Sequence, residues 1–471
     1  MRVILTLLVL IIIASELATL SGCANIIPPG GGPRDSLPPV LRTVTPPDSS
    51  RNFAAKKITF TFDEFVEIDN PRQNLLVSPV PKIDPVVESK LRTVTVTIKD
   101  TLEPNTTYSI DFGNAIKDIN EGNVLKNFRY LFTTGTYFDS LQLTGNVVVA
   151  ETGKPDSTLI VMLHTSLDDS AVIKERPRYV ARLDSSGRFR FRNLPPGTFA
   201  IYALKDEGGQ RRYLSKQQLF AFADSAVVTQ DAPGPITLYA YAEKEETEET
   251  ATPSLQRPAA RGRRAAAAPD NLQVSLNTPG GQLDLLSQLE IGFSTPLREF
   301  DSTKVQLTTD SFDILTGYHF LRDTSNQKVT LVYKWTENTG YNLILDSTVA
   351  TDTLGRRIPR TDTIAFRTRQ AKEYGEVRLR LLNLDLSLNP VLQFVQGDQV
   401  KFAYPMTSRN FNATLFPPGE YDLRILYDEN KNGIWDTGSF FENRKQPEKV
   451  QPIPRRLNIK ANWLNEIDIT L

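Results

Sequence analysis

The fold is decided by the short stretch KITFTF at residues 57–62, in which apolar and polar side chains strictly alternate. The same alternation returns in TVTVTI at residues 93–98, and again with Tyr108, Ile110 and Phe112. A period of two places successive side chains on opposite faces of an extended strand. Several such strands with turn residues between them predict a β-sandwich, with one face of each strand buried and the other in water.

The composition supports this prediction and excludes one class of partner. The chain has 471 residues, which is enough for three or four domains, and it contains 31 prolines and 26 glycines. That balance favours strands cut by turns over long helices. Lys and Arg number 54 against 55 Asp and Glu, so the net charge is near zero. Without a basic field, we expect no nucleic acid partner.

A second kind of module follows the first. The stretch SSGRFRF at residues 185–191 is a turn followed by a strand, and LPPGTF at residues 194–199 is a further turn and strand. Residues 244–270 then change character, with an acidic half, a basic half and almost nothing to bury. Such a composition predicts a flexible linker.

After the linker the chain repeats itself. LEIGFSTP at residues 289–296 matches the strand around Phe60, and FPPGEY at residues 416–421 matches the LPPGTF stretch at an offset of 222 residues. We therefore predict four β modules in the order A, B, linker, A′, B′. The predicted boundaries are a signal peptide at 1–22, a lipidated Pro/Gly tether at 23–38, A at 39–136, B at 137–243, the linker at 244–270, A′ at 271–370 and B′ at 371–471.

The N-terminus indicates export. An unbroken apolar run at residues 3–14 is shorter than the ~20 residues that span a membrane, and it has the length of a signal-peptide core. It is followed by Leu-Ser-Gly and Cys23, the only cysteine in the chain. This ending resembles the bacterial lipobox, which implies that Cys23 carries acyl chains such as palmitate and anchors the protein to a membrane. Ala24-Asn25 lacks the aspartate that retains many lipoproteins in the inner membrane, so we expect the outer membrane. An incidental cysteine after an ordinary signal peptide is the alternative.

Two family resemblances carry the fold further. Modules A and A′ resemble the bacterial Ig-like domain of S-layer-type proteins and Bacteroidota lipoproteins, through LEPNTTY at residues 102–108 and FTTG at residues 132–135. Modules B and B′ resemble the transthyretin-like or carboxypeptidase-regulatory-like sandwich, through the SSGRFRF and PPG turns. The resemblances imply an all-β chain of tandem Ig-like and transthyretin-like β-sandwiches. They imply no activity, because such sandwiches host many roles.

The sequence contains no recognisable catalytic constellation. Its two histidines, His164 and His319, lie in different modules, and the usual metalloprotease, serine hydrolase and phosphate-binding motifs do not occur. Sandwich modules of this size also leave little room for a deep cleft. We therefore predict that the protein is not an enzyme. A glycan hydrolase that takes its carboxylates from two modules stays open, and would need carboxyl groups roughly 5 to 10 Å apart.

One stretch near the C-terminus, YDENKNGIWDTG at residues 427–438, has the spacing of a calcium loop. Counted from the first ligand, Asp428, Asn430 and Asn432 fall at positions one, three and five, Ile434 could offer its carbonyl at seven, and Asp436 stands at nine. Position twelve is a serine and the flanks are strand-like, so this is not an EF-hand. Either calcium stabilises the turn, or Asn and Asp side chains close it by bonding the local backbone. No other cofactor is required.

These observations together predict a non-enzymatic outer-membrane lipoprotein that acts as a binding or scaffold module. We expect it to be held on the membrane by its lipid anchor, facing the periplasm or the outside, and to serve an envelope protein complex. Exposed sheet edges and loops would supply the contact surfaces. The alternative is a carbohydrate-binding or glycan-hydrolysing envelope protein.

Overall fold

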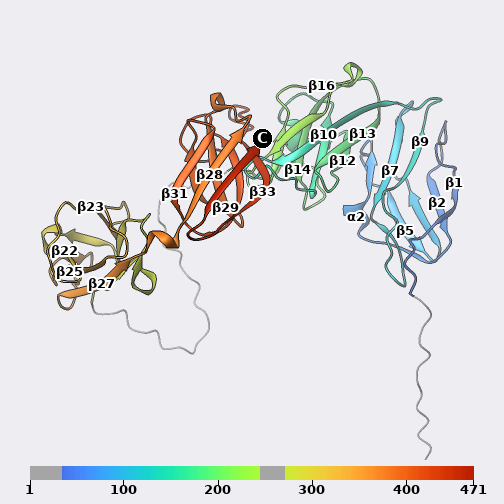
Figure 1. Cartoon of the computed structure of the whole chain (residues 1–471). Helices are drawn as coiled ribbons and strands as arrows, with labels where there is room; N and C mark the ends of the chain where they lie inside the picture. Colours follow the sequence, from blue (N-terminus) through green and yellow to red (C-terminus); the bar gives the residue numbers. More distant parts are fainter. Residues whose placement is uncertain (1–33, 244–270) are drawn as a thin grey trace, which may run out of the picture.

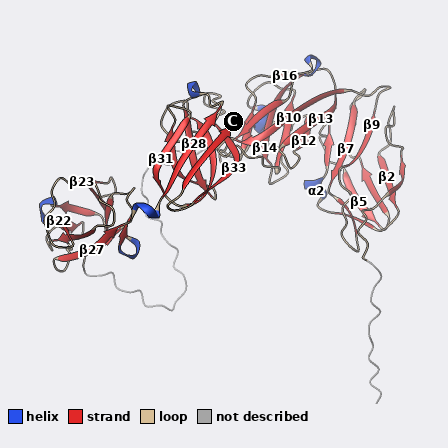
Figure 2. Ribbon diagram, in the orientation of Figure 1, coloured by secondary structure: helices blue, strands red, loops and turns tan. Residues whose placement is uncertain are grey.

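The computed structural model describes residues 34–243 and 271–471. Within these ranges nearly all regular structure is β-strand, arranged in small packed sheets (Figure 2). The prediction of an all-β chain of tandem sandwiches is confirmed. None of the described helices is long and apolar enough to cross a membrane. The predicted signal peptide, Cys23 and the linker at 244–270 lie outside the described residues.

Module A is a sandwich of two main sheets. Its sheets have the strand orders β1-β2-β6-β5 and β4-β7-β9, with a small β3-β8 ribbon. The elements are β1 (Leu41–Thr45), β2 (Lys57–Phe62), β3 (Val66–Ile68), α2 (Pro71–Asn74), β4 (Leu76–Ser78), β5 (Val86–Lys90), β6 (Thr93–Thr97), β7 (Thr107–Gly113), β8 (Ile116–Asp118) and β9 (Phe128–Thr133).

The core of module A follows directly from the alternation in its strands. Phe60 of β2 lies opposite Val94 of β6, and both side chains are fully buried. Phe60 meets the rings of Phe112 and Tyr130 from the other sheet edge-on, with centroids 5.3 Å away in each case. This edge-to-face geometry suits the ring quadrupoles and adds to the stabilisation from apolar burial.

Module B is a second sandwich, with a different topology. A three-stranded sheet of order β13-β10-β17 packs on a sheet of order β12-β11-β14-β15, and β16 also pairs with β14. The elements are β10 (Leu141–Val149), β11 (Leu159–His164), α3 (Ala171–Lys174), β12 (Tyr179–Arg182), β13 (Arg188–Leu194), β14 (Thr198–Lys205), β15 (Phe220–Phe222), β16 (Val227–Val228), η1 (Thr229–Asp231) and β17 (Ile236–Ala240).

The second half of the chain holds two further sandwiches. Module A′ contains β18 (Val274–Leu276), η2 (Pro279–Gly281), β19 (Gln282–Leu283), β20 (Leu289–Phe293), β21 (Leu297–Phe300), η3 (Ser302–Lys304), β22 (Val305–Thr309), β23 (His319–Arg322), β24 (Lys328–Val332), β25 (Gly340–Leu345), β26 (Ala350–Asp352) and β27 (Asp362–Thr368). The short η4 (Ala371–Glu373) leads into module B′, which contains β28 (Gly375–Leu382), η5 (Leu386–Leu388), β29 (Pro390–Gln396), β30 (Gln399–Pro405), β31 (Asn410–Phe416), β32 (Gly419–Tyr427), β33 (Lys449–Ile459) and β34 (Leu464–Thr470).

The two B-type modules repeat each other in topology. The sheets of B′ have the orders β31-β28-β34 and β30-β29-β32-β33, which correspond to those of B except that the single strand β33 takes the place of β15 and β16. Each module contains the same unusual parallel pair, β10 with β17 in B and β28 with β34 in B′. Shared topology, including a parallel pair inside otherwise antiparallel sheets, indicates that B and B′ are copies of one unit.

The modules follow a different order in space from their order in the chain. Figure 1 shows them arranged as A, B, B′, A′, so that B′ folds back onto B and A′ occupies the far end. Polar contacts join the outer pairs: Arg178 of B forms two 2.6 Å hydrogen bonds with Glu103 of A. The backbone N–H of Leu285 in A′ donates to the hydroxyl of Tyr374 in B′ at 2.9 Å.

Candidate functional site

Modules B and B′ share a hydrophobic core of their own, separate from the core inside each sandwich. Side chains from both modules are buried in one cluster, and both use the outer face of the equivalent sheet. Its members are Ala150, Met162, Val172, Tyr202, Leu204, Tyr213, Phe220, Phe222 and Tyr241 from B, and Val391, Leu426, Trp435, Phe440 and Val450 from B′. A buried core of this kind holds two modules in one fixed orientation.

A segment of B′ that is longer than its counterpart in B completes the interface. Residues 428–448 connect β32 to β33, whereas residues 206–219 connect β14 to β15. Phe440 in this longer segment is fully buried. Its ring centroid lies 5.0 Å from those of both Phe220 and Phe222 of B. We call residues 428–448 the docking segment.

Polar contacts fix the docking segment on B as well. The backbone N–H of Phe440 donates to the buried carboxylate of Glu243 at 3.2 Å. Arg444 forms an ion pair with Asp169 of B, and its guanidinium lies 5.2 Å from the ring centroid of Phe222. The combination of apolar burial with directional bonds specifies one register for the contact.

The predicted calcium residues lie at the start of this docking segment, and the structure brings them together. Asp428 is buried, and its carboxylate accepts hydrogen bonds from the backbone N–H groups of Asn432, at 3.2 Å, and Gly433, at 2.6 Å. The side-chain amides of Asn430 and Asn432 donate to Asp436 at 2.5 and 2.8 Å. These bonds are those of an Asx-rich turn, in which polar side chains bond the local backbone and one another.

A carboxylate that the loop motif did not include completes the turn. Glu448, just before β33, is buried, and it accepts hydrogen bonds from the backbone N–H groups of Glu429, at 2.8 Å, and Asp436, at 3.0 Å. Burial raises the pKa of Glu448 despite these bonds, and the charges of Asp436 and Asp428 add to the effect. Glu448 is too far along the chain for the twelve-residue pattern to indicate it. Ile434, the predicted carbonyl ligand, has an exposed side chain.

The turn orients the docking segment toward module B. The indole N–H of Trp435 donates to the backbone carbonyl of Glu448 at 2.8 Å, and this places the ring in the shared core. Among the described residues, no group of three or more His, Cys, Asp or Glu side chains is placed to hold a metal ion. A calcium ion in this turn stays a prediction.

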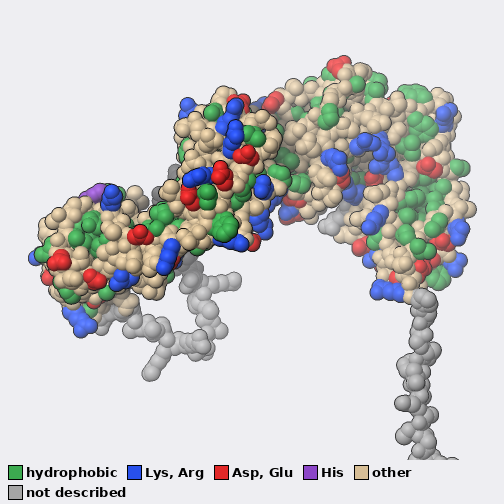
Figure 3. Space-filling model, in the orientation of Figure 1, with side chains coloured by type: hydrophobic (Ala, Val, Ile, Leu, Met, Phe, Trp, Pro, Cys, Tyr) green, Lys and Arg blue, Asp and Glu red, His purple; other side chains and the backbone are tan. Residues whose placement is uncertain are grey.

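A long groove of about 1460 Å³ runs between modules A and B. Arg188, Arg190 and Arg192 line it from the exposed face of β13, where they alternate with buried phenylalanines. Figure 3 shows Lys and Arg side chains gathered at this junction. The expectation that modules of this size leave little room for a deep cleft concerns each sandwich by itself, whereas this groove lies between two of them.

The carboxylates of the groove are held in ion pairs and turns. Asp111 pairs with Arg129 at 3.0 Å. The backbone N–H of Arg188 is the main donor that lowers the pKa of Asp184, which therefore stays ionised. A glycosidase needs one carboxylic acid whose pKa is raised, so Asp184 is the opposite of what a general acid requires.

The two histidines occupy separate and different environments. His164 ends β11 in module B, is almost fully buried and meets the ring of Tyr202 edge-on. Burial lowers its pKa to about 4, so the ring is neutral near neutral pH. His319 lies on the surface of β23 in module A′. The structure does not bring them together.

A comparison with known families identifies the first module. Residues 35–134 match the bacterial Ig-like domain. The match includes the strands from β1 to β9, and it agrees with the resemblance carried by the LEPNTTY and FTTG stretches. The transthyretin-like resemblance of B and B′ stays a prediction. A search of curated proteins finds no match to the chain.

Solved structures with some likeness include a pilin subunit and an S-layer protein. They include the Bacillus anthracis TIE protein (9% identity, 94% of this chain and 75% of that one, TM-score 0.15). The major pilin subunit BcpA of Bacillus cereus is another (10% identity, 70% and 99%, TM-score 0.16). A third is the N-terminal part of the S-layer protein SbsC (17% identity, 44% and 45%, TM-score 0.16). At these identities and TM-scores the likenesses carry no conclusion about function.

Proposed function

We propose that this protein is a non-enzymatic lipoprotein of the outer membrane, anchored through Cys23, that serves as a rigid scaffold for an envelope protein complex. The anchor is supported by the lipobox-like ending of the apolar N-terminal run. The scaffold role rests on one observation, the hydrophobic core shared by B and B′. It joins the A–B and A′–B′ pairs into a single array.

A fixed array is useful for holding partners at a set spacing. Modules joined only by linkers move relative to one another, whereas an interface with a buried core does not. The shared core therefore holds the inner modules B and B′ in one orientation, with A and A′ at opposite ends of the array in Figure 1. The groove between A and B offers a further contact surface close to the anchored end.

The test is affinity capture of the lipidated full-length protein from gently solubilised outer membrane. The expected result is a membrane-protein partner in stoichiometric amount. A Cys23→Ser variant, which cannot be acylated, serves as the control for anchoring and should be lost from the membrane fraction. Recovery of the lipoprotein alone, from a strain in which the anchor works, would contradict the scaffold proposal.

An acidic glycan is the second candidate partner, and the arginines of the groove favour it. Arg188, Arg190 and Arg192 project from one strand face at the two-residue spacing of a β-strand, roughly 7 Å apart. A row of cations suits a chain of carboxylates or sulfates. Polygalacturonate should bind and neutral dextran should not. Replacing all three arginines by glutamine should abolish the difference, whereas equal binding of both polymers would exclude this candidate.

A further inference from the structure

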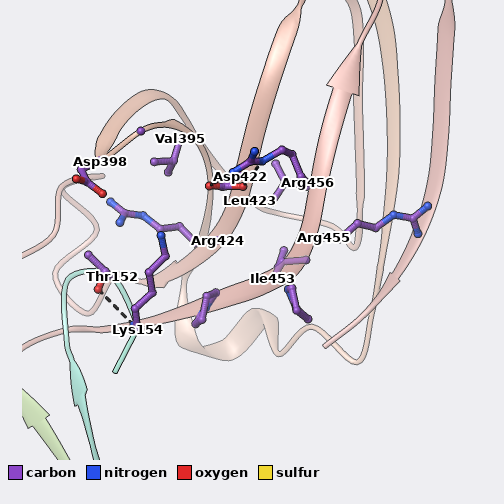
Figure 4. Close-up of a pocket in the computed structure, with 13 residues that line it drawn as sticks. Thr152, Lys154, Val395, Asp398, Asp422, Leu423, Arg424, Ile453, Arg455 and Arg456 are labelled. Atoms are coloured by element: carbon purple, nitrogen blue, oxygen red, sulfur yellow. Dashed lines mark hydrogen bonds and ion pairs between the residues drawn. The ribbon is translucent and has the colours of Figure 1, made fainter. Parts of the chain in front are cut away.

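A second, smaller cavity lies at the edge of the B–B′ interface. It encloses about 350 Å³, within the range of pockets that hold small molecules. Module B contributes only its β10–β11 turn, and module B′ contributes the rest (Figure 4). The lining residues are Thr152, Lys154, Val395, Gly397, Asp398, Asp422, Leu423, Arg424, Pro452, Ile453, Pro454, Arg455 and Arg456.

The β10–β11 turn is fixed closely against B′. The backbone N–H of Val450 donates to the carbonyl of Ala150 at 3.2 Å. Gly153 has φ +66°, and a Cβ atom there would lie 2.3 Å from Pro452. Only glycine fits this left-handed, crowded position. The close contact carries the next residue, Lys154, to the rim of the cavity.

The principal polar group in the cavity is a buried arginine. Arg424 of β32 is 8% exposed, and its Nε–H donates to Gln393 on the neighbouring strand at 2.7 Å. In the part of the chain that the structure describes, its two Nη atoms make no hydrogen bond or ion pair. Burial lowers the pKa of Arg424, and the charges of Glu151 and Asp398 offset this only in part. A buried charge without a partner is costly.

The other charges around the cavity do not supply that partner. Asp422 is held by Arg456, whose Nε lies 2.9 Å from its carboxylate. Asp398, in the β29–β30 turn, and Lys154 are both exposed. The charges of Glu151, the larger of the two contributors, and Asp398 act on Arg424 without forming an ion pair with it. The cavity is therefore lined by the buried Arg424, whose Nη atoms make no bond within the described residues, and by the exposed Lys154 and Asp398 at its rim (Figure 4).

We propose that this cavity binds a small organic carboxylate. The two Nη atoms of Arg424 donate to the two carboxylate oxygens, since a guanidinium and a carboxylate match as parallel pairs of bonds. Lys154 contributes a second positive charge from module B. The apolar part of the ligand lies against Val395, Pro452 and Ile453. Because residues of both modules line the cavity, the ligand also ties B to B′. This site does not depend on the scaffold role.

The test measures binding of phenylacetate to the full-length protein by isothermal titration calorimetry at fixed ionic strength. Phenylacetamide has the same shape without the charge, and inorganic phosphate has the charge without the apolar group. We expect saturable binding of one phenylacetate per chain, at least tenfold weaker binding of phosphate, and no binding of the amide. No phenylacetate binding, or equal binding of the amide, would overturn the proposal, and tighter binding of phosphate would overturn the choice of ligand class.

Variants assign the binding to the named residues. Arg424→Met should weaken phenylacetate binding at least tenfold, and Lys154→Gln should weaken it several-fold. Asp398→Asn should strengthen it, because the competing carboxylate is removed. Arg380→Gln and Lys401→Gln, on exposed strand faces away from the cavity, are the matched controls and should change nothing. Since Lys154 lies in a different module from β32, it keeps the test decisive even if Arg424→Met fails to fold. Unchanged affinity in Lys154→Gln and Asp398→Asn would refute the site.

Discussion

Modules B and B′ have the same strand topology, yet the corresponding positions at their interface carry opposite chemistry. In B, Met162 of β11 lies opposite Tyr202 of β14. In B′ the corresponding pair is Gln393 opposite Arg424. The first pair is buried in the shared core, where Tyr202 contacts Phe440, whereas Arg424 of the second pair lines a cavity.

This difference shows that the fold determines the position of a side chain at the interface but does not determine whether that side chain is apolar or charged. Both pairs are more than nine-tenths buried on the same face of the same sheet. The docking segment of B′ covers the pair in B, and the short β10–β11 turn of B only partly covers the pair in B′. A polar pair is tolerated only where the cover leaves room for a compensating group.

The largest effect should come from giving B the chemistry of B′. Tyr202→Arg would bury a second cation near Arg444, against Phe220 and Phe440, and we expect it to reduce the stability of the B–B′ interface by about 5 kcal/mol. Hydrogen exchange of the β15 amides would report the loss. Tyr137→Arg, at an exposed tyrosine, is the control and should stay near the unsubstituted protein. A tolerated Tyr202→Arg would mean that the face in B is as open as that in B′.

Removing the cover should come next. Phe440→Ala deletes a fully buried ring that touches three aromatic residues of B, and we expect a loss of about 4 kcal/mol. The neighbouring Phe441 is 43% exposed, so Phe441→Ala should cost about 1 kcal/mol. Both are measured by urea unfolding monitored through Trp435 in a background without the other tryptophans. Equal losses of stability in the two variants would show that Phe440 does not contribute more than Phe441 to holding the docking segment on B.

The pH dependence of stability should also distinguish the interface face of B from that of B′, because His164 of B corresponds to Val395 of B′. The pKa of His164 is lowered from 6.5 to about 4 in the folded state, so the unfolded chain binds the proton first as the pH falls. Stability therefore declines between pH 6.5 and 4, by up to about 3 kcal/mol. His164→Val should remove this part of the slope.

Unfolding in urea across this pH range would measure the effect. His319→Gln, on the exposed face of β23, is the matched control and should keep the slope of the original protein. If His164→Val kept the full slope as well, the acid sensitivity would have to come from carboxylates elsewhere in the chain.

Calcium should give the smallest effect and only in B′, because the corresponding turn in B lacks the asparagines. If the Asp428 turn binds the ion, calcium at about five times its Kd should stabilise the interface by about 1 kcal/mol over EDTA. Magnesium at the same ionic strength is the control, and Asp436→Asn should reduce the response. An identical melting temperature in calcium and in EDTA would contradict calcium binding and would support a metal-free Asx-rich turn.

The sandwiches themselves could be predicted from sequence because strand alternation is a local signal. The buried face of β2 is readable from Phe60 and Phe62 alone, and the repeat is readable from two PPG turns. Local patterns of this kind reflect the two-residue period of a strand, which does not depend on what the strand packs against.

The candidate sites could be predicted only in part, because they depend on how modules meet. The turn around Asp428 was recognisable from its spacing, but Glu448 and the burial of Phe440 against B result from B′ packing back across the linker. Arg424 looks like an ordinary outward-facing strand residue until its neighbour Gln393 and the turn at Gly153 are placed beside it. No periodicity in one strand carries that information.

The back-to-back packing of B and B′ also has an evolutionary consequence. Two identical subunits related by a two-fold axis would use the same patch twice, and every substitution would then enter both sides of the contact. Here Leu204 and Leu426, at equivalent positions, still meet in one core. Because B and B′ belong to one chain, a substitution enters only one side of the contact, and equivalent positions can differ as Tyr202 and Arg424 do. The two halves of one chain can therefore take different roles in the contact, as the two subunits of a heterodimer do. Here B′ supplies the docking segment and B supplies the surface that it covers.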